Sequence, residues 1–258
     1  MSTLFYKYQG TGNDFVVLDG RTFLHVPEVD WIQRICHRKW GVGSDGLVIV
    51  RPSETNDFHI DFYNPDGSQS FCGNGSRCAV SFYMTFFDGP KDDVTFSAID
   101  GNHSATIVGD EIKISMREVN GADHSPFGCF MNTGSPHVVV PVDELNEWNV
   151  KSEGAAIRYA DYFKQMNGTN VNFIQKMGEG WALRTYERGV EAETLSCGTG
   201  VTASALFILE QEKKSGAVVL HTPGGVLEVS AERKGAYQFT DVYLKGSVEK
   251  VFEGKWNY

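Results

Sequence analysis

The chain contains one short pattern twice: a cysteine, a glycine-rich turn and then an apolar run that is typical of a helix. Cys72-Gly73-Asn74-Gly75 precedes residues 76–84, and Cys197-Gly198-Thr199-Gly200 precedes residues 201–209. A cysteine at a helix N-terminus lies beside unpaired backbone N–H groups and the positive end of the helix dipole, which favour a thiolate and also attract a carboxylate. We therefore expect two thiols that face one acidic substrate.

The repeat extends upstream of both cysteines. Residues 10–15 and 168–173 each form a polar, asparagine-containing turn before an apolar stretch, and residues 59–64 and 182–188 each read as an alternating strand before the cysteine. With 258 residues and 41% hydrophobic content, the chain can form one large or two modest domains, and two fit the duplication better. The sequence therefore predicts two α+β lobes with a cleft between them.

Strand patterns outnumber helix patterns in the rest of the chain. The predicted strands include residues 4–8, 47–50, 105–108, 111–115, 137–140, 217–220 and 225–229. Helical spacing occurs in each half, over residues 29–37 and 154–163. The polar segment 119–126 is the best candidate for the crossing between the lobes.

Charge and cysteine content exclude several classes of protein. A net charge of −10, with no concentrated basic segment, argues against a nucleic acid or an anionic membrane as partner. The sequence contains no apolar run of transmembrane length, and we expect no signal peptide, because the strand-like residues 4–8 follow almost at once. The five cysteines are odd in number and scattered, which suits a reducing compartment, so we expect a cytoplasmic protein.

The proposed chemistry can be argued from the residues. Inverting a carbon centre by proton transfer requires a base on one face and an acid on the other, and two thiols that exchange their protonation states meet that need in both directions. Backbone N–H groups of Asn74, Gly198 and Thr199 at the two helix starts would hold the substrate carboxylate and stabilise the charge that develops on it. We expect no cofactor, since the sequence offers no clear phosphate-binding loop or lysine motif for pyridoxal phosphate.

The motifs, taken together and in order, resemble those of the diaminopimelate epimerase family, which interconverts the L,L and meso forms of diaminopimelate without a cofactor. They are GTGNDF (10–15), GVGSDG (41–46), YNPDGS (63–68), CGNGSRC (72–78), NTGSPH (132–137), TNVNF (169–173), YERG (186–189) and SCGTG (196–200). The resemblance covers nearly the whole chain. It implies a function in the synthesis of lysine and of the peptidoglycan precursor, a small diamino-diacid substrate, and a homodimer.

The resemblance also implies an α+β fold of two similar lobes related by a pseudo-twofold axis, each a mostly antiparallel sheet wrapped around a central helix. The N-terminal lobe would comprise residues 1–119 plus 251–258, with the last strand returning to it, and would carry Cys72. The C-terminal lobe would comprise residues 120–250 and carry Cys197. The active site would lie in the cleft between the two lobes.

Site roles follow from the same resemblance. Cys72 and Cys197 would be the catalytic pair, with His137 and Glu187 as the partners that tune the pKa of Cys72 and of Cys197 respectively. Arg188 would grip a carboxylate through two parallel bonds. The substrate-binding residues would be Asn13, Asn64, Gly73, Asn74, Asn170, Glu187, Arg188, Gly198 and Thr199.

Two positions depart from the common family pattern. Gly46 stands where many members carry a glutamine, so we expect one side-chain contact to be absent or supplied by water. Ser135 stands where an asparagine often precedes Pro-His; its hydroxyl still donates and accepts, but it is shorter. Both changes affect the predicted recognition of the distal end of the substrate and leave the cysteine pair intact.

We expect the other cysteines and histidines to have structural and not catalytic roles. We expect Cys36, Cys78 and Cys129 to be small buried side chains. The spacing of Cys72 and Cys78 is poor for a zinc site, so no metal is expected. Histidines other than His137 are taken as structural.

Three functions stay open at this point. The first is diaminopimelate epimerisation, which the motifs favour. The second is a two-thiol racemase or epimerase of another amino acid, such as proline, hydroxyproline or histidine. The third is a non-enzymatic binding or redox module in which the two cysteines form a disulfide.

Overall fold

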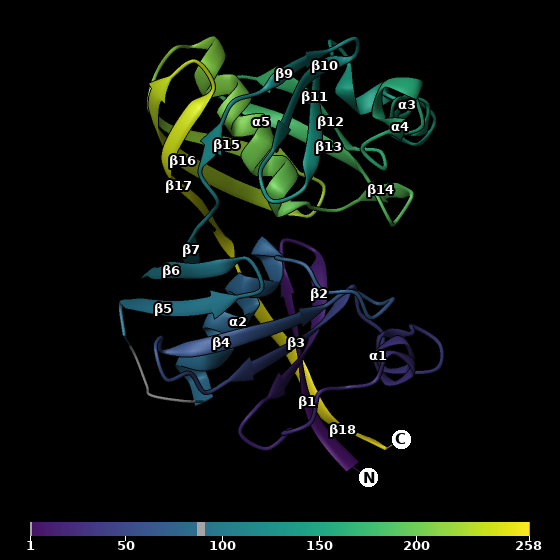
Figure 1. The fold of residues 1–258 in the computed structure, drawn as a ribbon, viewed down its shortest axis with the longest axis vertical. Coiled ribbons are helices and arrows are strands. Elements are labelled where there is room, and N and C mark those ends of the chain that lie inside the picture. Colours follow the sequence, from purple (N-terminus) through teal and green to yellow (C-terminus); the bar gives the residue numbers. More distant parts are fainter. Residues whose placement is uncertain (1, 87–90, 258) are drawn as a thin grey trace. The chain divides into compact units, whose positions relative to one another are not determined.

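The structure is a computed structural model that describes residues 2–86 and 91–257 (Figure 1). The chain divides into two compact units. Unit 1 comprises Met1–Ile114 and Gly246–Tyr258, and unit 2 comprises Ser115–Lys245. Each unit has its own set of paired strands and its own buried helix, so we describe the units one at a time.

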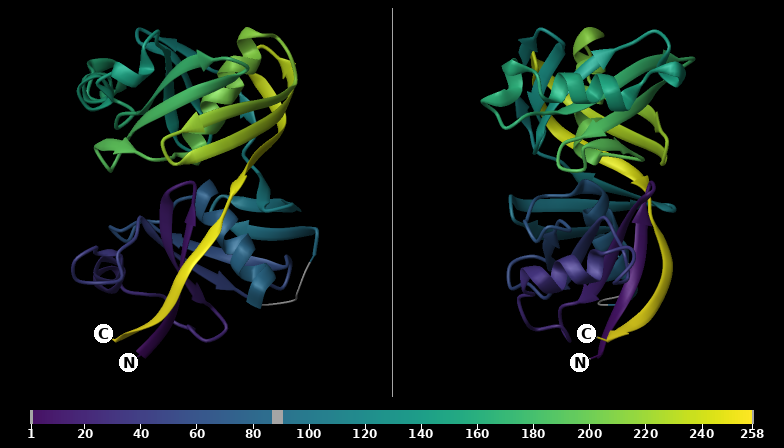
Figure 2. Two further views of the ribbon diagram at one scale, coloured as in Figure 1. Left: turned by 180° about the vertical axis from the view of Figure 1, so that it is seen from behind. Right: turned by 90° about the vertical axis from the view of Figure 1, so that its right-hand side faces the viewer.

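In the sheet of unit 1, strands from the two ends of the chain lie next to each other. The last strand, β18, pairs antiparallel with β1, from Ser2 opposite Asn257 to Gln9 opposite Glu249. Figure 2 shows these two strands running side by side toward the termini. The elements of unit 1 are β1 (Ser2–Gly10), β2 (Asn13–Asp19), α1 (Val29–Cys36), β3 (Gly46–Arg51), β4 (Phe58–Tyr63), α2 (Gly73–Phe86), β5 (Asp93–Ala98), β6 (Gly101–Val108), β7 (Glu111–Ser115, ending at the unit boundary) and β18 (Glu249–Asn257).

Unit 2 is formed by a continuous stretch of chain. The segment 119–126, proposed above as the crossing, lies in this unit, where β8 pairs with β17 and β9 pairs with β10. The elements of unit 2 are β8 (Val119–Asn120), β9 (Asp123–Ser125), β10 (Gly128–Asn132), β11 (Pro136–Pro141), the 3-10 turn η1 (Leu145–Glu147), α3 (Val150–Arg158), α4 (Asp161–Lys164), β12 (Asn170–Met177), β13 (Gly180–Glu187), β14 (Ala192–Thr194), α5 (Gly198–Gln211), β15 (Gly216–Thr222), β16 (Gly225–Gly235) and β17 (Gln238–Ser247, ending past the unit boundary).

The two units repeat one order of strand pairing. In unit 1 the antiparallel pairs β1–β2, β3–β4 and β5–β6 alternate with the parallel pairs β2–β3 and β4–β5. In unit 2 the antiparallel pairs β10–β11, β12–β13 and β15–β16 alternate in the same way with the parallel pairs β11–β12 and β13–β15. Parallel neighbours need a crossover connection, and the helices supply it: α1 and α2 in unit 1, and α3 with α4, then α5, in unit 2.

The second crossover helix of each unit is buried almost all round, as expected for a helix enclosed by a sheet. In α2, eight consecutive residues from Gly73 to Val80 are buried, and in α5 nine from Gly198 to Leu206. Small residues allow this close packing, and the buried hydroxyls of Thr202 and Ser204 donate to the carbonyls of Gly198 and Gly200, at 2.9 and 2.8 Å. Figure 1 shows α2 and α5 inside the strands of their own units.

The first crossover helices cover the outer faces of the sheets. Ile32 and Ile35 of α1 pack in one cluster with Val16, Leu18 and Leu47 of the sheet. In unit 2 a corresponding cluster joins the α3 and α4 side chains to the strands; it includes Val150, Ile157, Phe163, Val171 and Phe173.

The helices at 29–37 and after both cysteines are confirmed by α1, α2 and α5. The single helix predicted at 154–163 is wrong, because the structure has α3 and α4 in its place. α3 begins earlier, where the Asn149 side chain caps it by accepting from the Ser152 N–H at 3.1 Å. It ends because Ala160 is extended, at φ −60° and ψ 148°, before the chain turns into α4.

Candidate active site

Cys72 lies directly before α2 and caps it. Its carbonyl accepts the first helical bond, from the Ser76 N–H at 2.8 Å, and its sulfur accepts from the Gly75 N–H at 3.4 Å. The sulfur therefore occupies the place where a helix N-terminus presents its unpaired N–H groups and its positive dipole end. This environment favours a thiolate.

Cys197 holds the same position in unit 2. It is the N-cap of α5, with φ −127° and ψ 107°, and its carbonyl accepts from the Val201 N–H at 2.8 Å. The Cys197 side chain is buried, and its sulfur lies 3.5 Å from the Thr199 hydroxyl. Each unit thus presents one cysteine at the start of its central helix, which follows from the repeated strand order.

Two of the predicted asparagines meet in unit 1. The buried Asn74 side chain donates to Asn13 Oδ1 at 3.2 Å, and Asn13 in turn donates to Asp45 Oδ2 at 2.7 Å. The amide of Asn64 donates to the hydroxyls of Ser68 and Ser70, at 3.0 and 3.2 Å. Asn64 therefore braces the loop that leads from β4 to Cys72.

Gly46 has no room for a side chain. A Cβ atom there would lie 2.7 Å from Cε2 of Phe62 and 3.1 Å from the carbonyl oxygen of Tyr63. The ring of Phe62 thus fills the space beside β3 that a side chain at position 46 would enter. The packing explains why this chain carries glycine at that position.

Arg77, in the second turn of α2, is a residue that sequence reasoning missed. Its side chain is fully buried; Nη2 donates to the Thr11 hydroxyl at 3.3 Å, and within residues 2–86 and 91–257 Nε and Nη1 have no hydrogen-bond partner. Burial lowers the pKa of Arg77 to about 10, against the opposing effect of the Cys78 and Cys72 sulfurs. The guanidinium remains charged at neutral pH, so unit 1 holds a buried positive charge close to its site cysteine.

His137, on β11, lies at the centre of a buried hydrogen-bond network in unit 2. Its Nε2 is 2.8 Å from the hydroxyls of both Thr199 and Ser135, and its Nδ1 is 3.0 Å from Nδ2 of Asn172. The two hydroxyls lie 3.1 Å apart. Burial lowers the pKa of His137 to about 3, so the imidazole is neutral at physiological pH.

Arg188 follows β13 and is held by its backbone. Its N–H donates to Asn170 Oδ1 at 2.8 Å, while its guanidinium has no hydrogen-bond partner in the part of the chain that the structure describes. Burial lowers the pKa of Arg188, and the neighbouring charge of Arg158 adds to that effect. A half-buried cation without a carboxylate partner is well suited to bind an anionic ligand.

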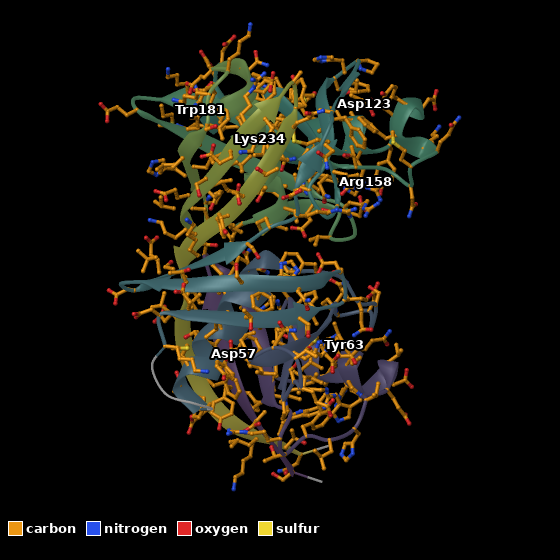
Figure 3. All side chains as sticks on the ribbon, turned by 60° about the vertical axis from the view of Figure 1, so that its left-hand side comes forward. Asp57, Tyr63, Asp123, Arg158, Trp181 and Lys234 are labelled. Atoms are coloured by element: carbon orange, nitrogen blue, oxygen red, sulfur yellow. The ribbon has the colours of Figure 1, made fainter. Side chains whose placement is uncertain are left out.

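Glu191 binds Arg158, the arginine whose charge acts on Arg188. Its Oε1 accepts from Arg158 Nη2 and from the Gly189 N–H, both at 3.0 Å, and its Oε2 accepts from Tyr159 at 2.8 Å. Burial opposes ionisation of Glu191, but these bonds outweigh it and lower the pKa of the carboxyl to about 2. Arg158 (labelled in Figure 3) is therefore engaged with Glu191. Glu187, the other predicted acid, accepts from the Thr194 hydroxyl at 2.9 Å.

The structure thus groups the predicted residues within each unit. Unit 1 holds Cys72, Gly73, Asn74 and Asn13 around the start of α2, with Asn64 on the preceding loop. Unit 2 connects Cys197, Thr199, Ser135, His137 and Asn170, since Asn170 Nδ2 lies 3.4 Å from the Ser135 hydroxyl. Sequence reasoning missed Arg77, Asn172 and Glu191. The first two lie inside quoted motifs, and a charged residue in an otherwise apolar helix was the available signal for Arg77.

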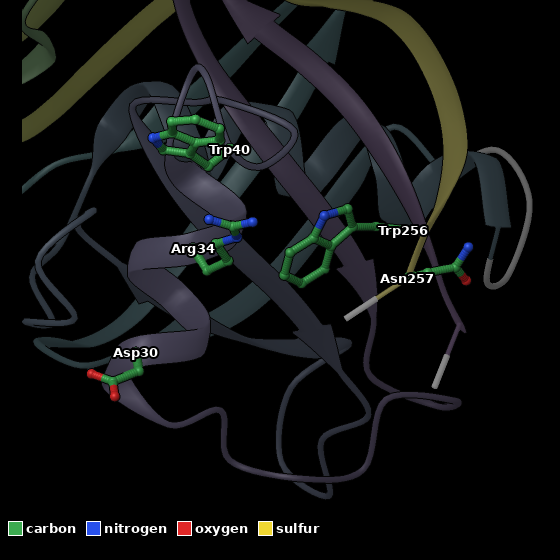
Figure 4. Close-up of a pocket in the computed structure, with 5 residues that line it drawn as sticks. All are labelled: Asp30, Arg34, Trp40, Trp256 and Asn257. Atoms are coloured by element: carbon green, nitrogen blue, oxygen red, sulfur yellow. The ribbon is translucent and has the colours of Figure 1, made fainter.

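Outside these groups, the described residues form a further pocket but no metal cluster and no membrane-spanning helix. Residues 2–86 and 91–257 contain no cluster of three His, Cys, Asp or Glu side chains that could hold a metal ion. No helix in that part of the chain is long and apolar enough to cross a membrane. A pocket of about 420 Å³ in unit 1 is lined by residues of α1, the following loop and β18, none of them a predicted site residue (Figure 4); these are Asp30, Arg34, Trp40, Trp256 and Asn257.

Solved structures share the fold at low sequence identity. A phenazine biosynthesis protein of the PhzF family from Bacillus anthracis matches with a TM-score of 0.82 and 15% identity, and each chain is covered completely. A hydroxyproline epimerase from Agrobacterium vitis matches with a TM-score of 0.73 and 12% identity, over 99% of this chain and 92% of that one. The predicted fold class, α+β with two similar lobes of mostly antiparallel sheet around a central helix, is confirmed, and the chain has the fold of these epimerases and PhzF proteins.

Comparison of sequences identifies the family within this group of proteins that share the fold. The sequence profile of the diaminopimelate epimerase family matches residues 5–120 and 129–251. The diaminopimelate epimerase of Flavobacterium psychrophilum is 45% identical over 96% of this chain and 98% of its own length, and that of Aquifex aeolicus is 41% identical over 97% and 96%. The chain belongs to the diaminopimelate epimerase family, as its motifs predicted, and it is an isomerase.

Proposed function

We propose that this chain interconverts L,L- and meso-diaminopimelate by proton transfer at the α-carbon, with Cys72 and Cys197 as the two acid–base groups. The observation that carries the mechanism is the equivalence of the two cysteines: each is the N-cap of the buried central helix in a unit of the same strand order. Family membership supports the substrate. The enzyme would serve lysine and peptidoglycan-precursor synthesis and need no added cofactor.

In this mechanism one cysteine is a thiolate and the other a thiol at the start of each turnover. The thiolate removes the α-proton from one face, and the thiol delivers its own proton to the opposite face, so the two sulfurs exchange protonation states. The reverse reaction starts from the exchanged form. Because each sulfur lies at a helix N-terminus, the positive end of the helix dipole stabilises its thiolate form.

The substrate carboxylate next to the reacting carbon would bind the backbone N–H groups at the two helix starts. Those of Gly73 and Asn74 begin α2, and those of Gly198 and Thr199 begin α5. Negative charge moves onto this carboxylate as the α-proton leaves, so these donors stabilise the transition state more than the bound substrate.

The unreacted end of the substrate would bind the polar residues outside the helix starts. The open guanidinium of Arg188 is suited to the distal carboxylate, with Asn13, Asn64 and Asn170 as amide partners and Glu187 for the ammonium group. Ser135 would contribute a hydroxyl, and Gly46 no side chain. His137 and Glu187 are the proposed tuning partners of Cys72 and Cys197; because His137 is neutral, its influence would be exerted through hydrogen bonds.

Hydrogen exchange tests this function. Purified, reduced protein without added cofactor should incorporate deuterium at the α-carbon of diaminopimelate in heavy water, as followed by NMR or mass spectrometry. Exchange only with proline, hydroxyproline or histidine would select the alternative of a two-thiol racemase of another amino acid. No exchange with any of them would contradict both and favour a binding or redox module.

We also propose that the enzyme is a cytoplasmic homodimer. Cys36, Cys78 and Cys129 are buried thiols, which suits a reducing compartment. Apolar side chains on the paired strands β1 and β18 are exposed, among them Leu4, Val251 and Phe252, and a second copy could cover them. Light scattering should give twice the mass of one chain, and Val251→Glu should shift it toward one; a monomeric wild type would contradict the dimer.

A further inference from the structure

The orientation of the Asn172 side chain is fixed by one partner that can only accept, the backbone carbonyl of Val138. A carbonyl oxygen only accepts, so the atom of Asn172 that lies 3.2 Å from the Val138 carbonyl is its NH2 group. The other end, Oδ1, accepts from the Thr185 hydroxyl at 3.1 Å. The same NH2 group lies 3.0 Å from His137 Nδ1, so Nδ1 accepts and carries no proton.

The proton of neutral His137 therefore lies on Nε2. This N–H faces two hydroxyl oxygens at 2.8 Å, those of Thr199 and Ser135, and donates to them. The Ser135 hydroxyl lies 3.4 Å from the Asn170 amide nitrogen, which can donate to it. It can in turn donate a hydrogen bond to the Thr199 hydroxyl, 3.1 Å away. The Thr199 hydroxyl is then left to donate to the Cys197 sulfur at 3.5 Å.

We propose that Asn172 is a positioning residue that locks His137 in its Nε2–H form, so that the imidazole, acting through the Thr199 hydroxyl, stabilises the Cys197 thiolate without taking up a proton. The proposal rests on the proposed function only in treating Cys197 as one of the acid–base thiols. It adds a link between His137 and Cys197 within one unit, beside the proposed role of His137 toward Cys72.

A neutral donor suits a thiol that must alternate between two forms. An imidazolium next to Cys197 would form a charged pair with the thiolate and oppose its reprotonation, whereas a hydroxyl supplies one hydrogen bond and can rotate to accept from the S–H when the sulfur is protonated. Two features keep His137 neutral: it is fully buried, and the positive charge of Arg188 acts on it. Nδ1 also faces an NH2 group, which would clash with a second ring proton.

The tautomer is tested directly by 15N NMR of imidazole-labelled protein, with the His137 signals assigned from a His137→Gln sample. We expect a neutral ring with the proton on Nε2 from about pH 5 to about pH 8. Asn172→Asp should move the ring proton to Nδ1, because a carboxylate only accepts. A wild-type ring that is protonated on Nδ1 in this range, alone or as imidazolium, would overturn the proposal even if the variant did not fold.

The link to Cys197 is tested by alkylation of the substrate-free protein with iodoacetamide, quantified on the Cys197 peptide across pH. Thr199→Val removes the hydroxyl and retains the shape and the backbone N–H; we expect alkylation about tenfold slower at a pH below the thiol pKa. Thr199→Ser should restore the wild-type profile. Equal profiles for all three proteins would refute the relay, and because no substrate is present, that outcome would leave the proposed epimerase reaction standing.

Discussion

Asn170 Oδ1 accepts a hydrogen bond from the backbone N–H of Arg188 at 2.8 Å, and the Asn170 amide donates to the Pro136 carbonyl at the same distance. The bond ties the first residue of β12 to the turn that follows β13. The Arg188 backbone is therefore fixed while its guanidinium stays open. Such an arrangement holds a cation in place for an anionic ligand at little further cost in chain entropy.

Arg188→Lys should weaken substrate binding. Lysine keeps the charge but cannot make two parallel bonds to a carboxylate, so we expect the KM for diaminopimelate to rise about tenfold, with a smaller effect on kcat. Steady-state kinetics would measure both. Arg233→Lys, whose ion pair with Glu210 lies outside the proposed site, is the matched control, and an unchanged KM in Arg188→Lys would refute the assignment.

Removing either site cysteine should abolish the reaction and leave the fold intact. Cys72→Ala and Cys197→Ala each deprive one face of the α-carbon of its proton carrier, so epimerisation should fall about a thousandfold or more. Circular dichroism would check folding. Cys129→Ala is the control, because Cys129 is a buried thiol whose pKa burial raises. Normal activity in either site variant would exclude a two-base mechanism.

A side chain at position 46 should destabilise unit 1. The Cβ of Gly46→Ala would meet the Phe62 ring at 2.7 Å, and overpacking of this kind costs about 1–3 kcal/mol of unfolding free energy. Denaturant titration would measure the loss. Adding Phe62→Leu should recover part of it, since the smaller side chain vacates the contact. If the double variant lost as much unfolding free energy as the two single variants together, the steric explanation would fail.

Arg77→Met should leave the protein as stable as the wild type or more so. A buried guanidinium with one weak hydrogen bond carries a desolvation cost, and replacing such a charge by an apolar side chain often gains about 1 kcal/mol or more. Arg184→Met is the contrasting variant: Arg184 makes two 2.7 Å bonds to Glu193, so its loss should destabilise. Equal losses in thermal unfolding for both variants would contradict this account.

His137 should make stability depend on pH. Its folded-state pKa of about 3 lies below the ordinary value near 6.5, so in the interval between them the unfolded chain binds a proton that the folded one does not. The contribution is complete above about pH 6.5 and is lost as the pH falls toward 3. In His137→Gln, the unfolding free energy should depend less steeply on pH across this interval, and the reduction should correspond to the uptake of up to one proton on unfolding. An unchanged slope would mean that His137 titrates normally.

Much of the fold could be predicted because short sequence patterns mark many of its helices and strands. The duplicated cysteine and glycine pattern marks the starts of α2 and α5, and alternating residues such as those of β7 and β15 mark the strands. The single helix expected at 154–163 failed because spacing alone does not reveal that Ala160 is extended between two helices. Helix ends depend on caps and packing more than on apolar period.

The missed site residues depend on contacts between distant parts of the chain. Asn172 meets His137 from 35 positions away, and Arg158 meets Glu191 from 33 positions away. Asn172 lies inside the motif TNVNF, but neither this motif nor the sequence around Glu191 reveals which distant side chain it contacts. The obstruction at Gly46 is likewise set by Phe62 on the neighbouring strand, which only the register of β3 and β4 brings alongside.

The pairing of β18 with β1 has a consequence for synthesis. Unit 2 is one uninterrupted segment, so all of it has left the ribosome before the final strand emerges. Unit 1, although most of it is made before unit 2, stays incomplete until β18 has been made, with one edge of β1 open. A nascent or truncated chain that lacks β18 would expose that edge to other chains, so β18 protects unit 1 from edge-to-edge aggregation.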